Sequence, residues 1–186
     1  YDLSGDVPWL MYQYVEGGTL ADAVERWRAL PAPTRLGKAV LTLYGIARAL
    51  KRVHTLDPPI VHRDLKPANV LMARGLPRVT DFGIGGAGVA ARAAAGRPHA
   101  DVELPAVLTA TGTDRYASPE QLFGGPPHPR DDVYALGVLA YQLVLSDLSA
   151  APGTDAADVL RRCGAPAALT ALIVRSMALD PERRPE

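Results

Sequence analysis

The segment from residue 62 to residue 83 constrains the fold of this chain most, because two short strand-like runs in it flank a single turn. Residues 70–72 and 78–80 have the composition of strands, and Arg74-Gly75-Leu76-Pro77 between them is typical of a turn. Strands joined by so short a connection can pair only as an antiparallel hairpin. We therefore expect Asn69 and Asp81, which flank the two strands, to lie at the same end of that hairpin.

Polar side chains crowd the same segment. It contains the run His62-Arg63-Asp64-Leu65-Lys66-Pro67-Ala68-Asn69, which is followed by Asp81-Phe82-Gly83. Carboxylate and amide oxygens are the hard ligands that Mg²⁺ prefers, and a lysine ammonium is a point charge suited to phosphate. The segment therefore predicts a site for phosphoryl transfer.

Length and charge limit the other possibilities. A chain of 186 residues can bury one hydrophobic core, so we expect one domain. Its 20 Lys and Arg balance 20 Asp and Glu, which favours neither nucleic acid nor an anionic membrane surface as a partner. The apolar run over 133–145 is too short to cross a bilayer and predicts a buried helix, with Tyr134 and Tyr141 in the core. The single cysteine, Cys163, predicts a buried thiol and a cytoplasmic protein without disulfides.

The rest of the chain is predicted to be mainly helical. Residues 8–15 predict a strand, after which Thr19 and Asp22 have capping-box spacing for a helix that ends by about Leu30. A second helix begins near residue 34 and ends near residue 56. Its apolar face is predicted from the spacing of Leu36, Val40, Leu43, Ala47 and Leu50. Further helices are predicted over 132–145, 156–162 and 166–178, whereas residues 84–111 lack periodicity and predict a long loop.

In order and phrasing, these motifs resemble a eukaryotic-type protein kinase of the bacterial Ser/Thr group, and specifically the C-terminal lobe of its catalytic domain. Three further motifs carry the resemblance: Gly112-Thr113-Asp114-Arg115-Tyr116-Ala117-Ser118-Pro119-Glu120, Asp132-Val133-Tyr134-Ala135-Leu136-Gly137 and Asp180-Pro181-Glu182-Arg183-Arg184-Pro185. The resemblance implies a mainly α fold, a helical bundle with short β-hairpins at the catalytic and metal loops. It makes residues 1–15 the last strand of the N-lobe and the hinge, residues 16–186 the C-lobe, and residues 81–120 the activation segment.

The resemblance also implies the chemistry. Asp64 would orient a Ser or Thr hydroxyl of a protein substrate and accept its proton, while Lys66 would meet the phosphoryl group that leaves ATP. Asn69 and Asp81 would hold Mg²⁺. The expected cofactors are thus ATP and Mg²⁺, and the expected partners are protein substrates, with no nucleic acid and no membrane segment in this chain.

On the nucleotide side, the resemblance aligns Gln13 and Val15 with the hinge that binds adenine, after Tyr12 at the gatekeeper position. Leu71 would form the apolar floor under adenine. Thr80 directly precedes the metal-binding aspartate and is also assigned to the nucleotide-binding side of the site.

Other matched residues would support the loops. Thr113 would bridge to Asp64 and Lys66, and Asp132 would hold the backbone of the catalytic loop, with His62 packed beside it. Glu120 would pair with Arg184. Arg63 would contact a phosphorylated residue of the activation segment, and Thr109 and Thr111 are the candidate phosphorylation sites.

The sequence also departs from the family pattern. The Gly-rich loop over the phosphates, the Val-Ala-Ile-Lys lysine and its glutamate partner would all come before Tyr1. We therefore expect residues 1–186 alone neither to bind ATP tightly nor to catalyse transfer, and to depend on an N-lobe in the full-length chain. Ser118 replaces the usual alanine, and residues 90–107 look like an insertion to which no function is assigned.

Two other functions stay open. The first is a pseudokinase or regulatory scaffold that keeps the fold without turnover. The second is a small-molecule phosphotransferase, such as an aminoglycoside phosphotransferase, which also uses an aspartate and an asparagine in this loop. Retention of Asp64, Lys66, Asn69 and Asp81 argues against the scaffold, and the motifs around Glu120 and Asp132 favour the protein kinase. His99 and His128 lack metal-ligand spacing, so we expect no zinc site.

Overall fold

The computed structural model describes residues 14–82 and 113–186, and every element below lies in these two ranges. Most of the predicted strand over 8–15 lies outside them, as do Tyr12 and Gln13. The same holds for the predicted loop over 84–111 with Thr109 and Thr111. Tyr14 and Val15 are not part of a strand.

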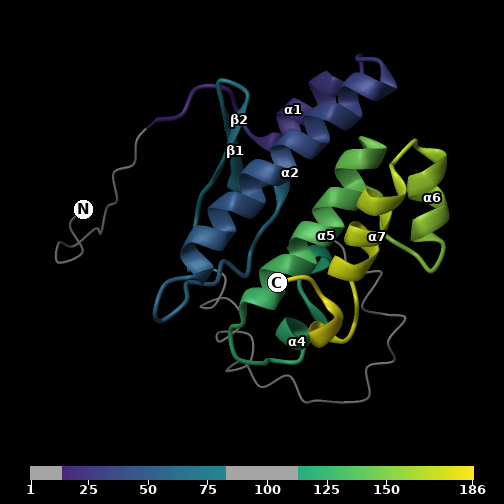
Figure 1. The fold of residues 1–186 in the computed structure, drawn as a ribbon. Helices are drawn as coiled ribbons and strands as arrows, with labels where there is room; N and C mark the ends of the chain where they lie inside the picture. The colour runs from purple at the N-terminus through teal and green to yellow at the C-terminus, as the bar shows by residue number, and fades with distance from the viewer. Residues whose placement is uncertain (1–13, 83–112) are drawn as a thin grey trace.

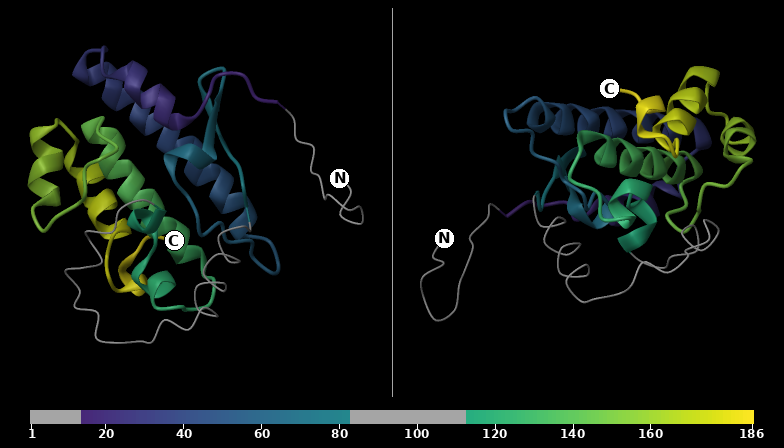
Figure 2. Two further views of the ribbon diagram at one scale, coloured as in Figure 1. Left: turned by 180° about the vertical axis from the view of Figure 1, so that it is seen from behind. Right: turned by 90° about the horizontal axis from the view of Figure 1, so that it is seen from below.

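Two long helices form the centre of the molecule. In the view of Figure 1, a β-hairpin lies on one side of α2 (Ala32–His54) and α5 (Pro129–Leu145) lies on the other, with α6 (Ala156–Arg162) and α7 (Ala167–Ser176) beyond α5. Figure 2 shows the same arrangement from behind and from below. The predicted mainly α fold is confirmed, with one antiparallel hairpin among the described residues. The shorter elements are α1 (Leu20–Trp27), η1 (Pro67–Asn69), η3 (Thr113–Tyr116), α4 (Pro119–Leu122) and η4 (Pro181–Arg183).

The predicted capping box opens α1. The hydroxyl of Thr19 accepts a hydrogen bond from the backbone N–H of Asp22 at 3.3 Å, and the Asp22 carboxylate accepts one from the backbone N–H of Thr19 at 2.8 Å. The backbone N–H and the hydroxyl of Thr19 both donate to the Asp22 carboxylate, and these two bonds hold the pKa of Asp22 below its usual value. The helix ends at Trp27, somewhat before the predicted Leu30.

The hairpin forms as predicted but with a tighter turn. Strands β1 (Val70–Ala73) and β2 (Leu76–Val79) pair antiparallel, and Val70 lies opposite Val79. Only Arg74 and Gly75 form the turn, and both have positive φ, 51° and 81°. A two-residue turn with two positive φ values matches the right-handed twist of the strands, so Leu76 and Pro77 belong to β2 rather than to the turn.

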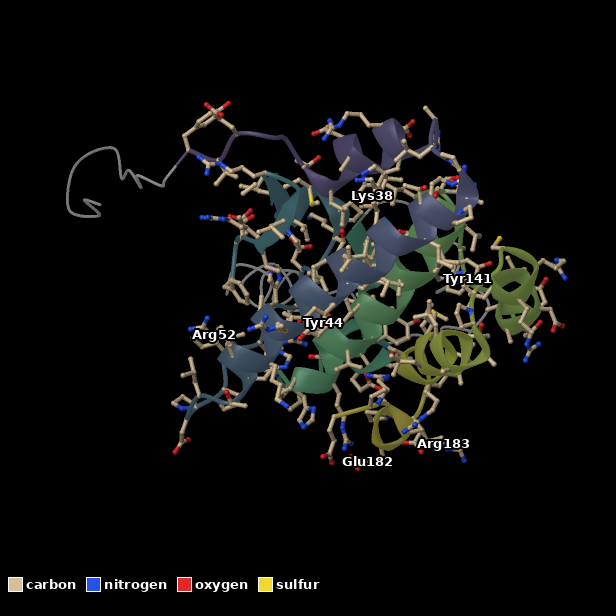
Figure 3. All side chains as sticks on the ribbon, turned by 45° about the horizontal axis from the view of Figure 1, so that its top comes forward. Lys38, Tyr44, Arg52, Tyr141, Glu182 and Arg183 are labelled. Carbon is tan, nitrogen blue, oxygen red and sulfur yellow. The ribbon has the colours of Figure 1, made fainter. Side chains whose placement is uncertain are left out.

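The buried face of α2 differs from the prediction. The helix buries Ala39, Thr42, Leu43, Ile46 and Leu50, whereas Val40 and Ala47 are exposed. Two apolar stripes share Leu43 and Leu50 on this helix, so spacing alone does not choose between them. The neighbouring α5 and β2 cover the stripe with Ala39 and Ile46. Leu41 and Tyr44 stay on the outside, and Figure 3 shows Lys38, Tyr44 and Arg52 along the length of the same helix.

The helix α5 is buried along most of its length, as the sequence predicted. Tyr134 and Tyr141 lie in the core. Gly137 lets α5 and α7 approach closely, since a Cβ at this position would lie 2.7 Å from the Cβ of Ser176 and 2.8 Å from the Cγ of Met177. Within the described ranges, no helix has both the length and the apolar character needed to cross a membrane.

The prediction of a buried Cys163 is wrong. This residue is exposed and caps the C-terminal end of α6. The helix directs Ala156 and Leu160 into the core, and the chain turns away at Gly164, whose φ is 84°. A small apolar residue at the end of a short helix therefore need not share its buried face.

Candidate active site

The backbone of residues 62–64 is anchored to α5 by Asp132, as the sequence predicted. The fully buried Asp132 carboxylate accepts hydrogen bonds from the backbone N–H groups of His62 and Arg63, each at 2.8 Å. It also contacts Nε2 of His54, at the end of α2, at 2.7 Å. Sequence reasoning missed His54, which belongs to no motif. One carboxylate thus joins two helices to the loop that carries Asp64.

The buried His62 links this loop to the segment before Asp81. Its Nδ1 accepts a hydrogen bond from the backbone N–H of Asp64 at 3.2 Å, so the ring hydrogen must lie on Nε2, which faces the Thr80 carbonyl at 2.7 Å. The ring also packs on Phe82, with centroids 4.8 Å apart. The predicted packed role of His62 is confirmed, and this residue holds two candidate ligand loops together.

Asp64, Lys66 and Asn69 form one hydrogen-bonded group. The Lys66 ammonium donates to both carboxylate oxygens of Asp64, at 3.0 and 2.9 Å. The amide nitrogen of Asn69 donates to the Asp64 carboxylate at 2.9 Å and to the Asp64 carbonyl at 2.8 Å. Because the amide nitrogen is used in this way, the Asn69 amide oxygen is the atom left for a cation. The side chains of Asp64 and Lys66 are about one-quarter exposed, so solvent and substrate can reach them.

Asp81 lies at the same end of the hairpin as Asn69. The backbone N–H of Thr80 donates to the Asn69 carbonyl at 2.9 Å, next to the first strand pair of Val70 and Val79. Asp81 itself is exposed and has a φ of 63°, in the left-handed region that non-glycine residues rarely adopt. The predicted convergence of Asn69 and Asp81 through the hairpin is present.

The donor set fits Mg²⁺ bound together with a nucleotide. Asn69 and Asp81 offer one amide oxygen and one carboxylate, and Mg²⁺ usually keeps several waters and phosphate oxygens in addition to one or two protein ligands. Among the described residues, no group of three His, Cys, Asp or Glu side chains is arranged to hold a metal by itself. The site therefore suits a metal that a polyphosphate brings with it, rather than a metal held by the protein alone.

The side of the site assigned to adenine is described only in part. Val15 and Leu71 are half-buried, and Thr19 pairs with Leu71 in an isolated bridge. The backbone N–H of Met72 donates to the Gly18 carbonyl at 2.9 Å. Gly17 has a φ of 123°, and a Cβ there would lie 2.0 Å from the Met72 carbonyl oxygen, so the segment approaches β1 closely only with glycine. These contacts tie the segment after Val15 to the strand that carries Leu71.

The glycines that follow Asp81 add little evidence for a nucleotide-binding loop. Gly83, Gly85 and Gly88 have the formal spacing Gly-x-Gly-x-x-Gly. Three glycines at this spacing are by themselves a weak signal for a phosphate loop. They also lie outside the described residues.

The predicted contact between Glu120 and Arg184 is present. The Arg184 side chain is fully buried, and its two terminal nitrogens each donate to one oxygen of Glu120 at 2.9 Å. The remaining donors reach the backbone carbonyls of Arg130, Ala178 and Leu179. Burial by itself would raise the pKa of Glu120, but the hydrogen bonds and charge of Arg184 outweigh it and hold that pKa below its usual value.

The segment from η3 to α4 is attached to α5 by polar contacts. The hydroxyl of Tyr116 donates to Gln142 at 2.8 Å, and the hydroxyl of Ser118 donates to Asp131 at 2.8 Å. The side chain of Thr113 lies outside the described part, so its bridge to Asp64 and Lys66 stays a prediction. Sequence reasoning missed Asp131 and Gln121 here. An acidic pair at the start of an apolar helix was the signal that could have revealed Asp131.

Comparison with known proteins places these motifs in a family. A profile described as "Protein kinase domain" matches residues 4–182. The serine/threonine-protein kinase PknB of Mycobacterium tuberculosis is 32% identical over 194 residues, which cover 97% of this chain and 29% of PknB. The serine/threonine-protein kinase Pkn2 of Myxococcus xanthus is 32% identical over 204 residues, which cover 98% of this chain and 22% of Pkn2.

A third relative is the serine/threonine-protein kinase drp72 of Corynebacterium efficiens, which is 37% identical over 137 residues, 73% of this chain and 23% of its own length. The chain thus spans about a quarter of the length of these curated relatives. The profile match covers nearly all of the chain and includes every motif described above except the last three residues of the motif at 180–185. The chain belongs to the protein kinase family and is related to the bacterial Ser/Thr kinases.

Proposed function

We propose that this chain forms part of the catalytic domain of a Ser/Thr protein kinase, which transfers the γ-phosphoryl group of ATP to a Ser or Thr hydroxyl of a protein. One observation carries the proposal: Asp64, Lys66 and Asn69 form a single hydrogen-bonded group, in which Asp64 and Lys66 are partly exposed, at the hairpin end where Asp81 also lies. A general base, a cation for phosphate and two oxygen ligands for Mg²⁺ are the parts that such a transfer needs.

Asp64 is proposed to orient the substrate hydroxyl and to accept its proton. Its carboxylate is held by Lys66 and Asn69, while its backbone is held through the N–H contact to His62. A base held from several sides is oriented before substrate arrives, and positioned bases typically contribute about 10²- to 10⁴-fold in rate. The partial exposure of Asp64 leaves room for a hydroxyl.

Lys66 is proposed to share its charge between Asp64 and the transferred phosphoryl group. An ammonium has three donors, so Lys66 can keep its contact with Asp64 while another donor meets a phosphate oxygen. Asn69 and Asp81 would hold Mg²⁺, which neutralises charge on the phosphates when bound. The loop that carries Asp64 and the segment before Asp81 keep their relative position as long as His62 keeps its contacts to Asp64 and Thr80.

The nucleotide is proposed to lie between the hinge residues Gln13 and Val15 and the floor residue Leu71, with Thr80 next to the metal ligand. This assigns residues 1–15 to the last N-lobe strand and hinge, residues 16–186 to the C-lobe and residues 81–120 to the activation segment. The backbone contacts between the segment at residues 18–19 and β1 support this side of the assignment.

We also propose that an isolated polypeptide of residues 1–186 does not transfer phosphate. Within these residues the resemblance supplies no equivalent of the lysine that grips the α- and β-phosphates, nor of its glutamate partner. Robust phosphorylation by this purified polypeptide would contradict the proposal.

The test is a radiolabelled ATP assay on the full-length protein with a generic basic protein as substrate. Asp64→Asn is expected to lower kcat by about 10³-fold, since the variant keeps the shape of the side chain but cannot accept a proton. Asp158→Asn is the matched control, because Asp158 is an exposed carboxylate on α6 that pairs with the exposed Arg161. Wild-type kcat in Asp64→Asn would overturn the assignment of the base.

The same assay separates the alternatives. A scaffold would show no transfer in the wild-type protein, and Asp64→Asn would change nothing. A small-molecule phosphotransferase would label no protein but would consume ATP in the presence of its small substrate. Asp64-dependent labelling of protein is expected only for the protein kinase.

A further inference from the structure

Arg63 is a buried cation directly before Asp64. Its side chain is 5% exposed, and its backbone has a φ of 61°, in the left-handed region. A guanidinium keeps its charge at every physiological pH, so its burial requires a counter-charge or hydrogen-bond acceptors close by. The groups around Arg63 therefore determine how the start of the catalytic loop is held.

The counter-charge comes from Asp131, in the first turn of α5. Oδ2 of this buried carboxylate lies 3.3 Å from Nε of Arg63, and Nη2 of Arg63 donates to the Gly125 carbonyl at 2.9 Å. Nε has no well-oriented hydrogen bond among the described residues, so charge rather than a directed hydrogen bond holds this pair.

Asp131 is itself held in place by its neighbours. Its Oδ1 accepts a hydrogen bond from the hydroxyl of Ser118 at 2.8 Å, and its Oδ2 accepts one from the backbone N–H of His128 at 3.3 Å. The second bond belongs to the capping box of α5. The first turn of a helix favours a negatively charged side chain, so this position on α5 suits a carboxylate.

The neighbouring contacts complete the enclosure of Arg63. Asp132 accepts the backbone N–H of Arg63 at 2.8 Å, and the side-chain amide of Gln121 donates to the Arg63 carbonyl at 2.6 Å. Two adjacent carboxylates on α5 thus hold Arg63. Asp132 binds the backbone of Arg63, and Asp131 binds its side chain. All of these contacts come from the described residues of the chain.

We propose that Asp131 is a positioning residue for phosphoryl transfer: it supplies, from within the chain, the negative charge that holds Arg63, so the catalytic loop needs no phosphate on the activation segment. This inference rests on the proposed function. Phosphorylation of Thr109 or Thr111 stays a prediction, but its phosphate is not required to hold Arg63. Ser118 supports the same arrangement by fixing the Asp131 carboxylate.

The first test compares Asp131→Asn with Glu182→Gln in the full-length protein. Glu182 makes an exposed ion pair with Arg130, the residue before Asp131, and Figure 3 shows Glu182 at the outer edge of the molecule. Asp131→Asn is expected to lower kcat about tenfold with little change in the KM for ATP, whereas Glu182→Gln keeps wild-type kinetics. A folded Asp131→Asn protein with wild-type kcat would overturn the proposal.

The second test asks whether phosphate is needed. Wild-type protein is treated with a phosphatase, and mass spectrometry verifies that Thr109 and Thr111 are unmodified. We expect kcat to stay within about twofold of the kcat of the untreated enzyme. A role of Asp131 in folding alone makes no prediction about the effect of removing phosphate. A loss of about tenfold or more on dephosphorylation would show that a phosphate holds Arg63 instead, and would overturn the inference.

Two further measurements cover the remaining outcomes. If Asp131→Asn fails to fold, Ser118→Ala removes one hydrogen bond to the carboxylate, together with the cap on the backbone N–H of Gln121 in α4, and is expected to lower kcat by about two- to threefold. If the wild-type protein transfers no phosphate, the proposed function fails, and hydrogen exchange still tests the inference. Asp131→Asn should then speed amide exchange at residues 62–64, and Glu182→Gln should not. Unchanged exchange in Asp131→Asn would overturn the inference.

Discussion

Two polar clusters of this molecule use the same kinds of charge for different purposes. The catalytic cluster consists of Asp64, Lys66 and Asn69, and the anchor cluster consists of Glu120, Asp132 and Arg184. The side chains of Asp64 and Lys66 are 22% and 24% exposed, whereas those of Asp132 and Arg184 are 0% exposed. In the anchor cluster, the five N–H donors of Arg184 make five hydrogen bonds.

The difference between the clusters teaches how rigidity and reactivity are separated here. Asp64 and Lys66, which must exchange partners with a substrate, are partly exposed, so water can replace a lost contact at little cost. Asp132 and Arg184, which bind backbone groups, are buried, where an unpaired charge is expensive. Glu120, the partner of Arg184, is 31% exposed, and Asn69 is buried beside Asp64. Mutations in the anchor cluster should therefore act through folding, and mutations in the catalytic cluster should act through turnover.

The largest effect is expected for Asp132→Ala. The substitution removes the acceptor for the backbone N–H groups of His62 and Arg63 and the partner of His54. Stability should fall by about 3–5 kcal/mol, because buried donors lose their partner, and activity should fall with it. Urea unfolding measures this change, with the exposed Asp158→Ala as a control that stays within about 0.5 kcal/mol of wild type. A small loss of stability in Asp132→Ala would contradict the assignment of Asp132 to the residues that hold the fold.

The next effect is expected for Lys66→Met, and it should have the opposite character. We expect kcat to fall about 100-fold, or about 2.7 kcal/mol in the barrier, because the transferred phosphoryl group loses a cation. Stability should change by less than about 1 kcal/mol, since Lys66 is partly exposed. Lys38→Met, on the solvent side of α2 in Figure 3, is the control and should leave kcat unchanged. If Lys66→Met lost stability as well as kcat, the proposed separation of catalytic residues from residues that hold the fold would be contradicted.

The smallest effect is expected for Glu120→Gln and depends on pH. The pKa of Glu120 is lowered in the folded state from an ordinary value of 4.5, so its contribution to stability is present above that value and is lost as pH falls through the lowered pKa. The variant should be less stable than wild type by about 1–2 kcal/mol at pH 7, because charged hydrogen bonds are lost. The gap should narrow below pH 4.5, whereas the exposed Glu25→Gln should show no such trend. A gap independent of pH would mean that charge at Glu120 does not stabilise the fold.

Local signals predicted much of the architecture. The capping box of Thr19 and Asp22, the hairpin around Gly75 and the three C-terminal helices depend on residues close in sequence, so composition and spacing are sufficient to find them. The grouping of Asp64, Lys66 and Asn69 is also local. It was predicted from the motif, and the hairpin explains why Asn69 lies at the same end as Asp81.

Long-range choices were not predictable in the same way. The spacing of apolar residues on α2 allowed two stripes, and the packing of α5 and β2 selected the one with Ala39 and Ile46. His54 and Asp131 lie outside the named family motifs, and each acquires its role only when a partner from a distant segment reaches it. Cys163 was placed in the core from its chemistry alone, although its position at a helix end decides its exposure.

The contact between Glu120 and Arg184 has a consequence for how the chain folds as it is made. The two residues are 64 positions apart, and Arg184 follows α5, α6 and α7 in the chain, so it is synthesised after all of these helices. Until Arg184 is available, the segment around α4 lacks its attachment to the turn at η4. The protein should therefore fold its central helices first and close the segment next to the catalytic loop last.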